Sequence, residues 1–244
     1  MKLVLLPLAL IMILALASSA GRAANSKKDY KAYLDPKKPI DVRVKDLLSR
    51  MTLEDKVRQL TEDWGIPGNE RLGIPPLAKA EAVHGFGYGT GATMFPQAIG
   101  LAATWDTDLM YRVADVIGKE TLEANTYQVW SPVLDVARDP RWGRVEETYG
   151  EDPYLVSRMG VAYITGFQKC NLIATPKHFA AHGAPLGGRD SNDVGYSERV
   201  MREVFLPPFR AAFVEANAGS VMNAYSAWED GAPCASSKEL LKGK

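Results

Sequence analysis

The chain has 244 residues, with 29 lysines and arginines against 29 aspartates and glutamates, so its formal net charge is zero at neutral pH. A balanced charge gives no electrostatic attraction to nucleic acid or to an anionic membrane, and we expect a neutral partner. Only two cysteines occur, Cys170 and Cys234, which excludes a disulfide-framework fold and a CxxC metal pair. They could form one bridge, but we expect two separate thiols.

Residues 1–20 predict an export signal. Lys2 gives a positive end, residues 3–17 are almost all Leu, Ile, Val, Met and Ala, and a small-residue cleavage site ends at Ala20. The apolar run is shorter than the about 20 residues that a transmembrane helix needs. We therefore expect a secreted or periplasmic protein without membrane contact after signal removal, with an uncleaved anchor as the alternative.

Residues 21–40 are polar and contain two prolines, a composition that predicts an extended lead-in. We expect residues 41–244 to form one domain. An amphipathic helix is predicted from Asp41, which could cap it. A second helix is predicted from Thr52, where the sequence T-L-E-D resembles a capping box.

Beyond residue 67, short apolar runs alternate with helices, a pattern typical of parallel βα units. The predicted strands are Leu77–Ala80, Ile99–Ala103, Gln128–Ser131, Leu172–Pro176 and Ser220–Ala224. The predicted helices are Asp108–Glu123, Tyr154–Phe167 and a helix from Ser197 towards Phe205 that resumes after Pro207-Pro208 to about Ala216.

Polar residues follow the ends of the predicted strands: Glu81, His84, Arg144, Lys177, His178 and Tyr225. In a (β/α)8 barrel the active site is built from the loops at these ends, so the side chains would converge on one face. A doubly wound sheet would do the same, but it usually carries a G-x-G-x-x-G turn, which the glycines at 85, 87, 89 and 91 do not form. The pattern favours the barrel.

The segment Val133–Leu155 is rich in charge and has neither helix nor strand periodicity. It contains three arginines and six carboxylates, with Trp142 and Tyr149 between them. A loop this long inside a compact domain is usually functional or disordered, and the aromatic residues argue against disorder. Its charges could all pair and only brace the fold, or one arginine could remain for a ligand.

We predict no metal and no cofactor. His178 and His182 are four residues apart, but Phe179 replaces the glutamate of H-E-x-x-H, and the pair follows a strand rather than lying on a helix. Serine-nucleophile chemistry has no support either, because the chain contains no G-x-S-x-G elbow.

Several motifs resemble glycoside hydrolase family 3, on its β-glucosidase and β-xylosidase side. They are R-D-P-R-W-G-R-V-E-E-T-Y-G-E-D-P-Y at 138–154, K-H-F at 177–179, V-M-N-A-Y at 221–225, E-A-V-H-G at 81–85, F-P-Q-A-I-G-L-A-A-T-W at 95–105 and M-T-L-E-D-K-V at 51–57. The resemblance implies the N-terminal part of a retaining, exo-acting β-glycosidase, whose carboxylate nucleophile and carboxyl acid/base remove a terminal β-linked sugar. The implied fold is an incomplete (β/α)8 barrel, truncated before its last strands.

The resemblance implies a substrate-binding set of seven residues: Glu81, Arg144, Lys177, His178, Arg189, Met222 and Tyr225. Glu81 matches an acidic residue that accepts hydrogen bonds from the outer sugar hydroxyls. Arg144, Lys177 and His178 match donors to the same sugar. The residues that match braces of the charged loop are Arg138, Asp139 and Glu147.

Met222 matches an apolar wall of the pocket, and Tyr225 matches a tyrosine near the nucleophile. Arg189 follows a loop that varies within the family. The family's nucleophile lies in a G-x-V-x-S-D motif, which has no match in the 244 residues, and the usual acid/base also comes from later sequence. We therefore assign no catalytic residue here, and expect the remaining, C-terminal part of the same enzyme as a partner.

A glucosaminidase is not favoured, because its K-H-F-P-G-H-G and D-S-H motifs read K-H-F-A-A-H-G and D-S-N here. The favoured function is therefore hydrolysis of terminal β-linked glucose, by a fragment that is inactive alone. The alternatives are a β-xylosidase of the same family and a sugar-binding fragment without chemistry.

Overall fold

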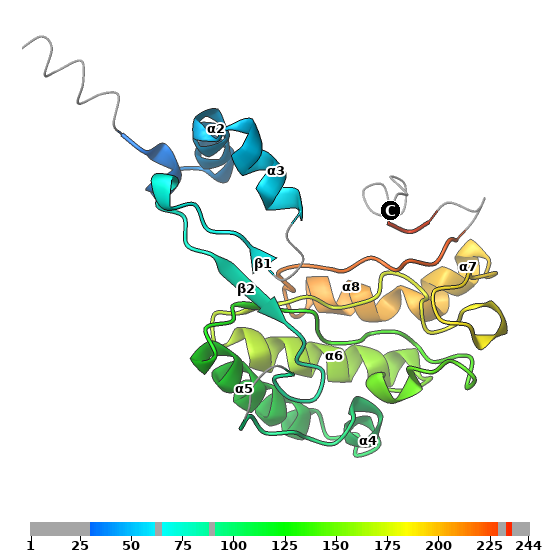
Figure 1. The fold of residues 1–244 in the computed structure, drawn as a ribbon. Coiled ribbons are helices and arrows are strands. Elements are labelled where there is room, and N and C mark those ends of the chain that lie inside the picture. Colours follow the sequence, from blue (N-terminus) through cyan, green and yellow to red (C-terminus); the bar gives the residue numbers. More distant parts are fainter. Residues whose placement is uncertain (1–29, 62–64, 88–90, 229–232, 236–244) are drawn as a thin grey trace, which may run out of the picture. The chain divides into compact units, whose positions relative to one another are not determined.

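The computed structural model describes residues 30–61, 65–87, 91–228 and 233–235 (Figure 1). The predicted signal, residues 1–20, lies outside these ranges, as do residues 21–29 of the lead-in. None of the described helices is long and apolar enough to cross a bilayer. The chain divides into two compact units, which are Met1–Glu62 with Asn69–Ile74 and Asp63–Gly68 with Pro75–Lys244.

The first unit contains the helices α2 (Ile40–Arg50) and α3 (Leu53–Thr61) and the 3-10 turns η1 (Ala32–Leu34) and η2 (Glu70–Leu72). Both predicted helices are present. Because α2 begins at Ile40, however, Asp41 lies in its first turn and does not cap it. The turn η1 also shows that the described part of the lead-in is not simply extended.

The capping box predicted at the start of α3 is present. Thr52 Oγ1 accepts a hydrogen bond from the backbone N of Asp55 at 3.1 Å, and Asp55 Oδ2 accepts one from the backbone N of Thr52 at 2.9 Å. Two otherwise unpaired amides at the helix start are thereby satisfied.

The second unit is an α/β fold with a mixed sheet in the order β1-β2-β3-β4. Strand β1 (Gly65–Ile66) is antiparallel to β2 (Leu77–Ala80), whereas β3 (Gln128–Val129) and β4 (Ile173–Ala174) continue the sheet in parallel. Strand β2 has the predicted bounds, whereas β3 and β4 are shorter than predicted, although Trp130 N still donates to Ala80 O at 2.9 Å beyond the end of β3.

The helices that connect the parallel strands are α5 (Thr107–Glu123), between β2 and β3, and α6 (Pro153–Gln168), between β3 and β4. Helix α8 (Pro207–Val214) follows, and Figure 1 shows α5, α6 and α8 side by side. Asp106 caps α5 by accepting from Leu109 N at 2.8 Å, and Asp152 caps α6 by accepting from Tyr154 N at 2.7 Å. The aspartates immediately before each apolar stripe thus set where the two helices begin.

The helix predicted from Ser197 is present in three pieces: α7 (Glu198–Val200), the π-helical turn η5 (Met201–Phe205) and α8. Pro207 occupies the first turn of α8, where its missing N–H costs nothing. The proline pair therefore starts a helix there, as well as interrupting the one before it.

The predicted strand Ile99–Ala103 is wrong, because residues 98–102 form the helix α4 (Ala98–Ala102). Its buried residues are Ala98, Leu101 and Ala102, which recur at i, i+3 and i+4. A five-residue apolar run contains too little sequence for its period to separate a strand from a buried helical turn.

The predicted strand Ser220–Ala224 is reduced to one parallel bridge between Phe179 and Asn223. Phe179 N donates to Met222 O at 2.8 Å, and Met222 N donates to Pro176 O at 3.1 Å. This segment therefore runs beside the continuation of β4, which brings the residues after both segments to the same end of the sheet.

Candidate sugar-binding site

The site lies where the chain leaves β2, β3 and β4. Glu81 directly follows β2, Asp135 and the charged loop follow β3, and Lys177 and His178 follow β4. The loop is tied to the last segment by the bridge between Val133 and Lys177. Because the three strands are parallel neighbours, their carboxyl ends bring these residues to one edge of the sheet.

Glu81 and Lys177 form an ion pair in this site. Lys177 Nζ donates to both carboxylate oxygens, at 2.7 and 2.9 Å. The Lys177 side chain is only 3% exposed, whereas the Glu81 side chain is 36% exposed. A buried ammonium needs a compensating charge, which the carboxylate of Glu81 supplies, and this more accessible carboxylate can still reach a ligand.

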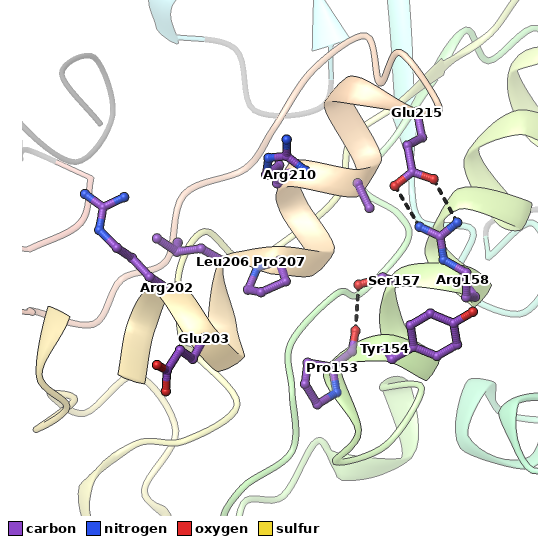
Figure 2. A pocket seen from close by; sticks show the side chains of 11 residues that line it. Pro153, Tyr154, Ser157, Arg158, Arg202, Glu203, Leu206, Pro207, Arg210 and Glu215 are labelled. Atoms are coloured by element: carbon purple, nitrogen blue, oxygen red, sulfur yellow. Dashed lines mark hydrogen bonds and ion pairs between the residues drawn. The ribbon is translucent and has the colours of Figure 1, made fainter. Parts of the chain in front are cut away.

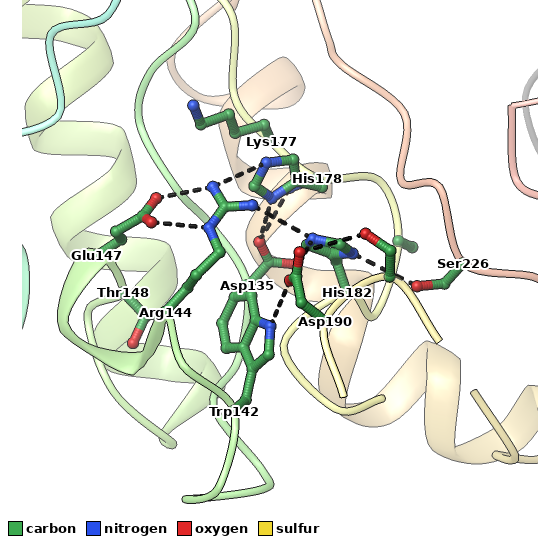
Figure 3. Close-up of polar contacts among 12 residues, drawn as sticks. Asp135, Trp142, Arg144, Glu147, Thr148, Lys177, His178, His182, Asp190 and Ser226 are labelled. Atoms are coloured by element: carbon green, nitrogen blue, oxygen red, sulfur yellow. Dashed lines mark hydrogen bonds and ion pairs between the residues drawn. The ribbon is translucent and has the colours of Figure 1, made fainter. Parts of the chain in front are cut away.

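Arg144 is held by both oxygens of Glu147, which accept from Nε at 2.7 Å and from Nη2 at 2.8 Å (Figure 3). Its other edge faces two imidazoles: Nη2 lies 3.3 Å from Nε2 of His178, and Nη1 lies 3.4 Å from Nε2 of His182. Burial would raise the pKa of Glu147, but the hydrogen bonds and charge of Arg144 outweigh it and lower that pKa. Glu147 is thereby kept ionised and is unsuited to act as a general acid.

His178 is oriented by Asp135, a buried carboxylate. Asp135 Oδ2 lies 2.7 Å from His178 Nδ1 and accepts from the backbone N of His178 at 3.2 Å. Asp135 is 1% exposed, so these contacts are shielded from water. The segment that carries His178 has cis peptide bonds at Lys177–His178 and Phe179–Ala180.

His182 is the second imidazole that contacts Arg144. Its ring is fully buried, packs edge-on against Trp142 with centroids 5.5 Å apart, and lies 3.3 Å from Asp190 through Nε2. Asp190 in turn accepts from Trp142 Nε1 at 2.7 Å. Burial lowers the pKa of His182, so the ring is neutral around pH 7.

A cavity of about 400 Å³ opens over this cluster. Its charged lining includes Glu81, Arg144 and Lys177, and its apolar side is formed by Val83 and Met94. Other lining residues are His84, Gly85, Gly87, Gln97, Glu146 and Glu147. Charged groups with several donors and acceptors beside a short apolar wall suit a neutral polyol.

A larger groove of about 560 Å³ lies between α6 and the segment from Arg202 to Glu215 (Figure 2). Arg158 donates to both oxygens of Glu215 at 2.7 and 2.8 Å, and Arg202 donates to Glu198 at 2.7 Å. These charges neutralise one another, and the lining comes from helices and their ends rather than from segments that follow strands. We therefore locate the candidate site in the smaller cavity.

The predicted set is only partly assembled around the cavity. Met222 is half-buried in the segment beside β4 and does not line it. Tyr225 is 70% exposed, and its ring centroid lies 6.5 Å from that of His182. Arg189 is exposed and is not among the lining residues. Of the predicted set, Glu81, Arg144 and Lys177 line the cavity, whereas His178 contacts Arg144 without being a lining residue, and the other three lie at the margin or outside.

The predicted braces differ in what they do. Glu147 pairs with Arg144, whereas Asp139 pairs with Arg141, whose hydrogen bonds lower the pKa of Asp139 to about 2. Arg138 is exposed, and its backbone N donates to Gly183 O at 3.3 Å.

Asp135, His182 and Asp190 have no site role in the sequence-based prediction. For Asp135 a signal exists: it is a lone carboxylate in the apolar run V-L-D-V that follows a strand. Both cysteines are free thiols, as expected. Within the ranges that the structure describes, no three His, Cys, Asp or Glu side chains are arranged to hold a metal ion.

The chain matches the model of the glycosyl hydrolase family 3 N-terminal domain over residues 44–244. It is 42% identical to a β-xylosidase of Formosa agariphila over 95% of the chain and 33% of that protein. It is 36% identical to a β-glucosidase of Bacteroides ovatus over 88% of the chain and 31% of that protein. The chain thus spans about a third of the length of these relatives.

Among solved structures, the fold resembles a β-glucosidase of Kluyveromyces marxianus in complex with glucose. The TM-score is 0.74 at 33% identity, over 82% of this chain and 25% of that one.

Proposed function

Because this chain belongs to glycosyl hydrolase family 3, we propose that its cavity binds the terminal, non-reducing sugar of a β-linked substrate in a retaining, exo-acting β-glycosidase. The observation that carries this proposal is the convergence of Glu81, Arg144, Lys177 and His178 at the ends of three parallel strands. These four residues match, position by position, the sugar-binding residues that the family resemblance implies.

The charge arrangement supports a neutral ligand. Each cation of the cavity already has a carboxylate partner, since Lys177 pairs with Glu81 and Arg144 pairs with Glu147. An anionic ligand would have to compete with these partners, whereas a hydroxyl can accept from a cation and donate to its carboxylate at the same time. Neutral sugars fit this pattern better than phosphates or uronic acids.

The fold supports an incomplete (β/α)8 barrel as the setting of the site. Three parallel strands alternate with helices, and the polar residues follow their carboxyl ends, as in a barrel of this type. The motif of the family's nucleophile has no match in the 244 residues. We therefore propose that these residues bind the sugar and that the catalytic carboxylates belong to sequence outside them.

Two substrates fit the family, and we propose both as candidates. Terminal β-glucose is the first, supported by the motif resemblance and by the 36% identical β-glucosidase. Terminal β-xylose is the second, and the specific observation in its favour is the 42% identity to a β-xylosidase. The apolar run at residues 3–17 supports a secreted or periplasmic location for either enzyme.

A chimera tests the proposal without assuming anything about the rest of this protein. Residues 44–244 replace the matching third of the Formosa agariphila β-xylosidase, and the chimera is assayed on chromogenic β-xyloside and β-glucoside. We expect hydrolysis with retention of the anomeric configuration, and none from the 244-residue chain alone. The ratio of kcat/KM on the two glycosides then decides between the two candidates.

Two variants of the chimera provide the control. Lys177→Met removes a cation of the cavity and is expected to lower kcat/KM by about a hundredfold or more. Arg138→Ala removes an exposed arginine of the same loop and is expected to change it less than about threefold. A folded chimera in which both variants behave alike would refute the assignment of the site.

A further inference from the structure

The guanidinium of Arg144 constrains the protonation of both imidazoles beside it. A guanidinium has five N–H donors and no acceptor. Its contacts with His178 Nε2 at 3.3 Å and His182 Nε2 at 3.4 Å are therefore hydrogen bonds only if both ring nitrogens accept. Each ring would then be neutral and carry its hydrogen on Nδ1.

The partners of His178 agree with this tautomer. Asp135 Oδ2 lies 2.7 Å from His178 Nδ1, and a carboxylate can only accept, so Nδ1 donates. His182 is less well determined. Its Nδ1 lies 3.4 Å from Ser226 Oγ, but Asp190 lies 3.3 Å from its Nε2 and competes with Arg144 for that nitrogen. His178 is thus the ring whose tautomer is fixed from both sides.

The carboxylate of Asp135 is committed to His178. One oxygen accepts from both the ring and the backbone N of His178, and among the described residues the buried Oδ1 has no hydrogen-bond partner. The carboxylate therefore holds the backbone as well as the ring. If it only balanced a charge, a contact with Arg144 or Lys177 would be expected instead.

We propose that Asp135 is a positioning residue that keeps His178 in the Nδ1–H tautomer, so that Nε2 of His178 accepts from Arg144 and helps to hold this guanidinium at the cavity. This inference rests on the proposed function for the identity of the ligand, and it gives His178 an acceptor role towards Arg144 in place of the donor role to the sugar that the sequence resemblance implies. Arg144 is then held by Glu147 at one edge and by His178 at the other. Asp135 thereby acts on a bound sugar through His178 and Arg144.

The ring nitrogens can be observed directly. The chain contains three histidines, so selective ¹⁵N labelling gives three ring spin systems, which His84→Gln and His182→Gln assign by elimination. At pH 7.5 and without sugar, we expect His178 to show a protonated Nδ1 and an unprotonated Nε2 in long-range ¹H–¹⁵N correlation spectra. A ring protonated at Nε2, or at both nitrogens, would overturn the proposal.

Three variants separate positioning from structural support. In Asp135→Ala the buried Nδ1–H loses its acceptor, so His178 is expected to shift to the Nε2–H tautomer. Asp135→Asn retains a carbonyl oxygen that can accept from the ring and the backbone, so it should keep the Nδ1–H tautomer even if it lowers stability. Asp139→Ala, in the same loop but paired with Arg141, should leave the His178 ring unchanged. A His178 ring that stays Nδ1–H in Asp135→Ala would contradict the positioning role.

Sugar binding tests the consequence for Arg144 separately. Methyl β-xyloside is titrated into the chain and into Asp135→Ala, Asp135→Asn and Asp139→Ala. We expect Asp135→Ala to weaken binding by about tenfold or more, and Asp135→Asn and Asp139→Ala to weaken it less than about threefold. Equal affinities of Asp135→Ala and Asp139→Ala would overturn the positioning of Arg144. Failure of the parent sugar to bind, with the tautomer as predicted, would count against the proposed function and leave the role of Asp135 intact.

Discussion

Lys177 Nζ donates to both carboxylate oxygens of Glu81, at 2.7 and 2.9 Å, although 96 residues separate the two in the sequence. The contact joins the ends of β2 and β4, which are separated in the sheet by β3. It therefore links two strand ends across the candidate site, and we expect the stability of the unit to depend on this pair.

Removing the carboxylate should cost more than removing the cation. Glu81→Ala leaves a buried ammonium without a partner, and we expect a loss of about 2–3 kcal/mol in the free energy of unfolding. Lys177→Met replaces the charge by an apolar chain of similar length, so its cost should be about 1 kcal/mol or less.

Urea denaturation of the two single variants and of the double variant measures this coupling. In the double variant Lys177→Met should recover part of the loss that Glu81→Ala causes. Strictly additive losses would show that the two side chains do not interact in solution.

The lowered pKa of His182 leads us to expect a smaller free energy of unfolding in mild acid. Burial lowers its pKa below the usual 6.5, so the folded chain binds this proton less readily than the unfolded chain. Between pH 6.5 and the lowered pKa the unfolded state therefore binds more protons, and stability falls as the pH is lowered through this window. Carboxylates with lowered pKa values, such as Glu147, add a separate loss below their usual value of 4.5.

Thermal unfolding between pH 7.5 and 5 measures the contribution of His182. We expect Tm to fall on acidification and this fall to be smaller in His182→Gln. An identical pH profile in the two proteins would show that His182 is not the group responsible.

The contact between α5 and α6 depends on Gly166. A Cβ atom at this position would lie 2.4 Å from the carbonyl oxygen of Tyr111 on α5, and a backbone oxygen cannot move aside cheaply. We expect Gly166→Ala to lower the free energy of unfolding by about 1–3 kcal/mol. Gly143→Ala is the matched control, because a Cβ there meets nothing within 4 Å. Equal stabilities of the two variants would contradict close packing of these helices.

The parts of the fold that were predictable carry their signal locally. Helices α5 and α6 have apolar stripes of helical period behind a capping aspartate, so their existence followed from the sequence. Helix α4 could not be predicted from the sequence, because its five residues are too few to show a helical period. The segment beside β4 was predicted as a strand, but it forms one parallel bridge only, and pairing between distant segments has no local signature.

The same distinction holds in the site. Glu81 and Lys177 could be found because they directly follow strands, whose ends converge in any parallel sheet. The contacts of Arg144 with two imidazoles could not be predicted, because the loop of Arg144 lacks periodicity and the two histidines come from a distant segment. Asp135 was passed over among the six carboxylates of the loop, although its place in the apolar run V-L-D-V is a signal of burial.

The most direct test of the central claim is equilibrium binding of methyl β-xyloside and methyl β-glucoside to the 244-residue chain and two variants. Titration calorimetry compares Arg144→Ala, which removes a side chain of the cavity, with Arg138→Ala, which removes an exposed arginine six residues earlier. We predict that Arg144→Ala weakens binding by about 10–100-fold while Arg138→Ala leaves it within about twofold. Equal affinities of the two variants for both sugars would contradict the assignment of this cavity as the sugar site.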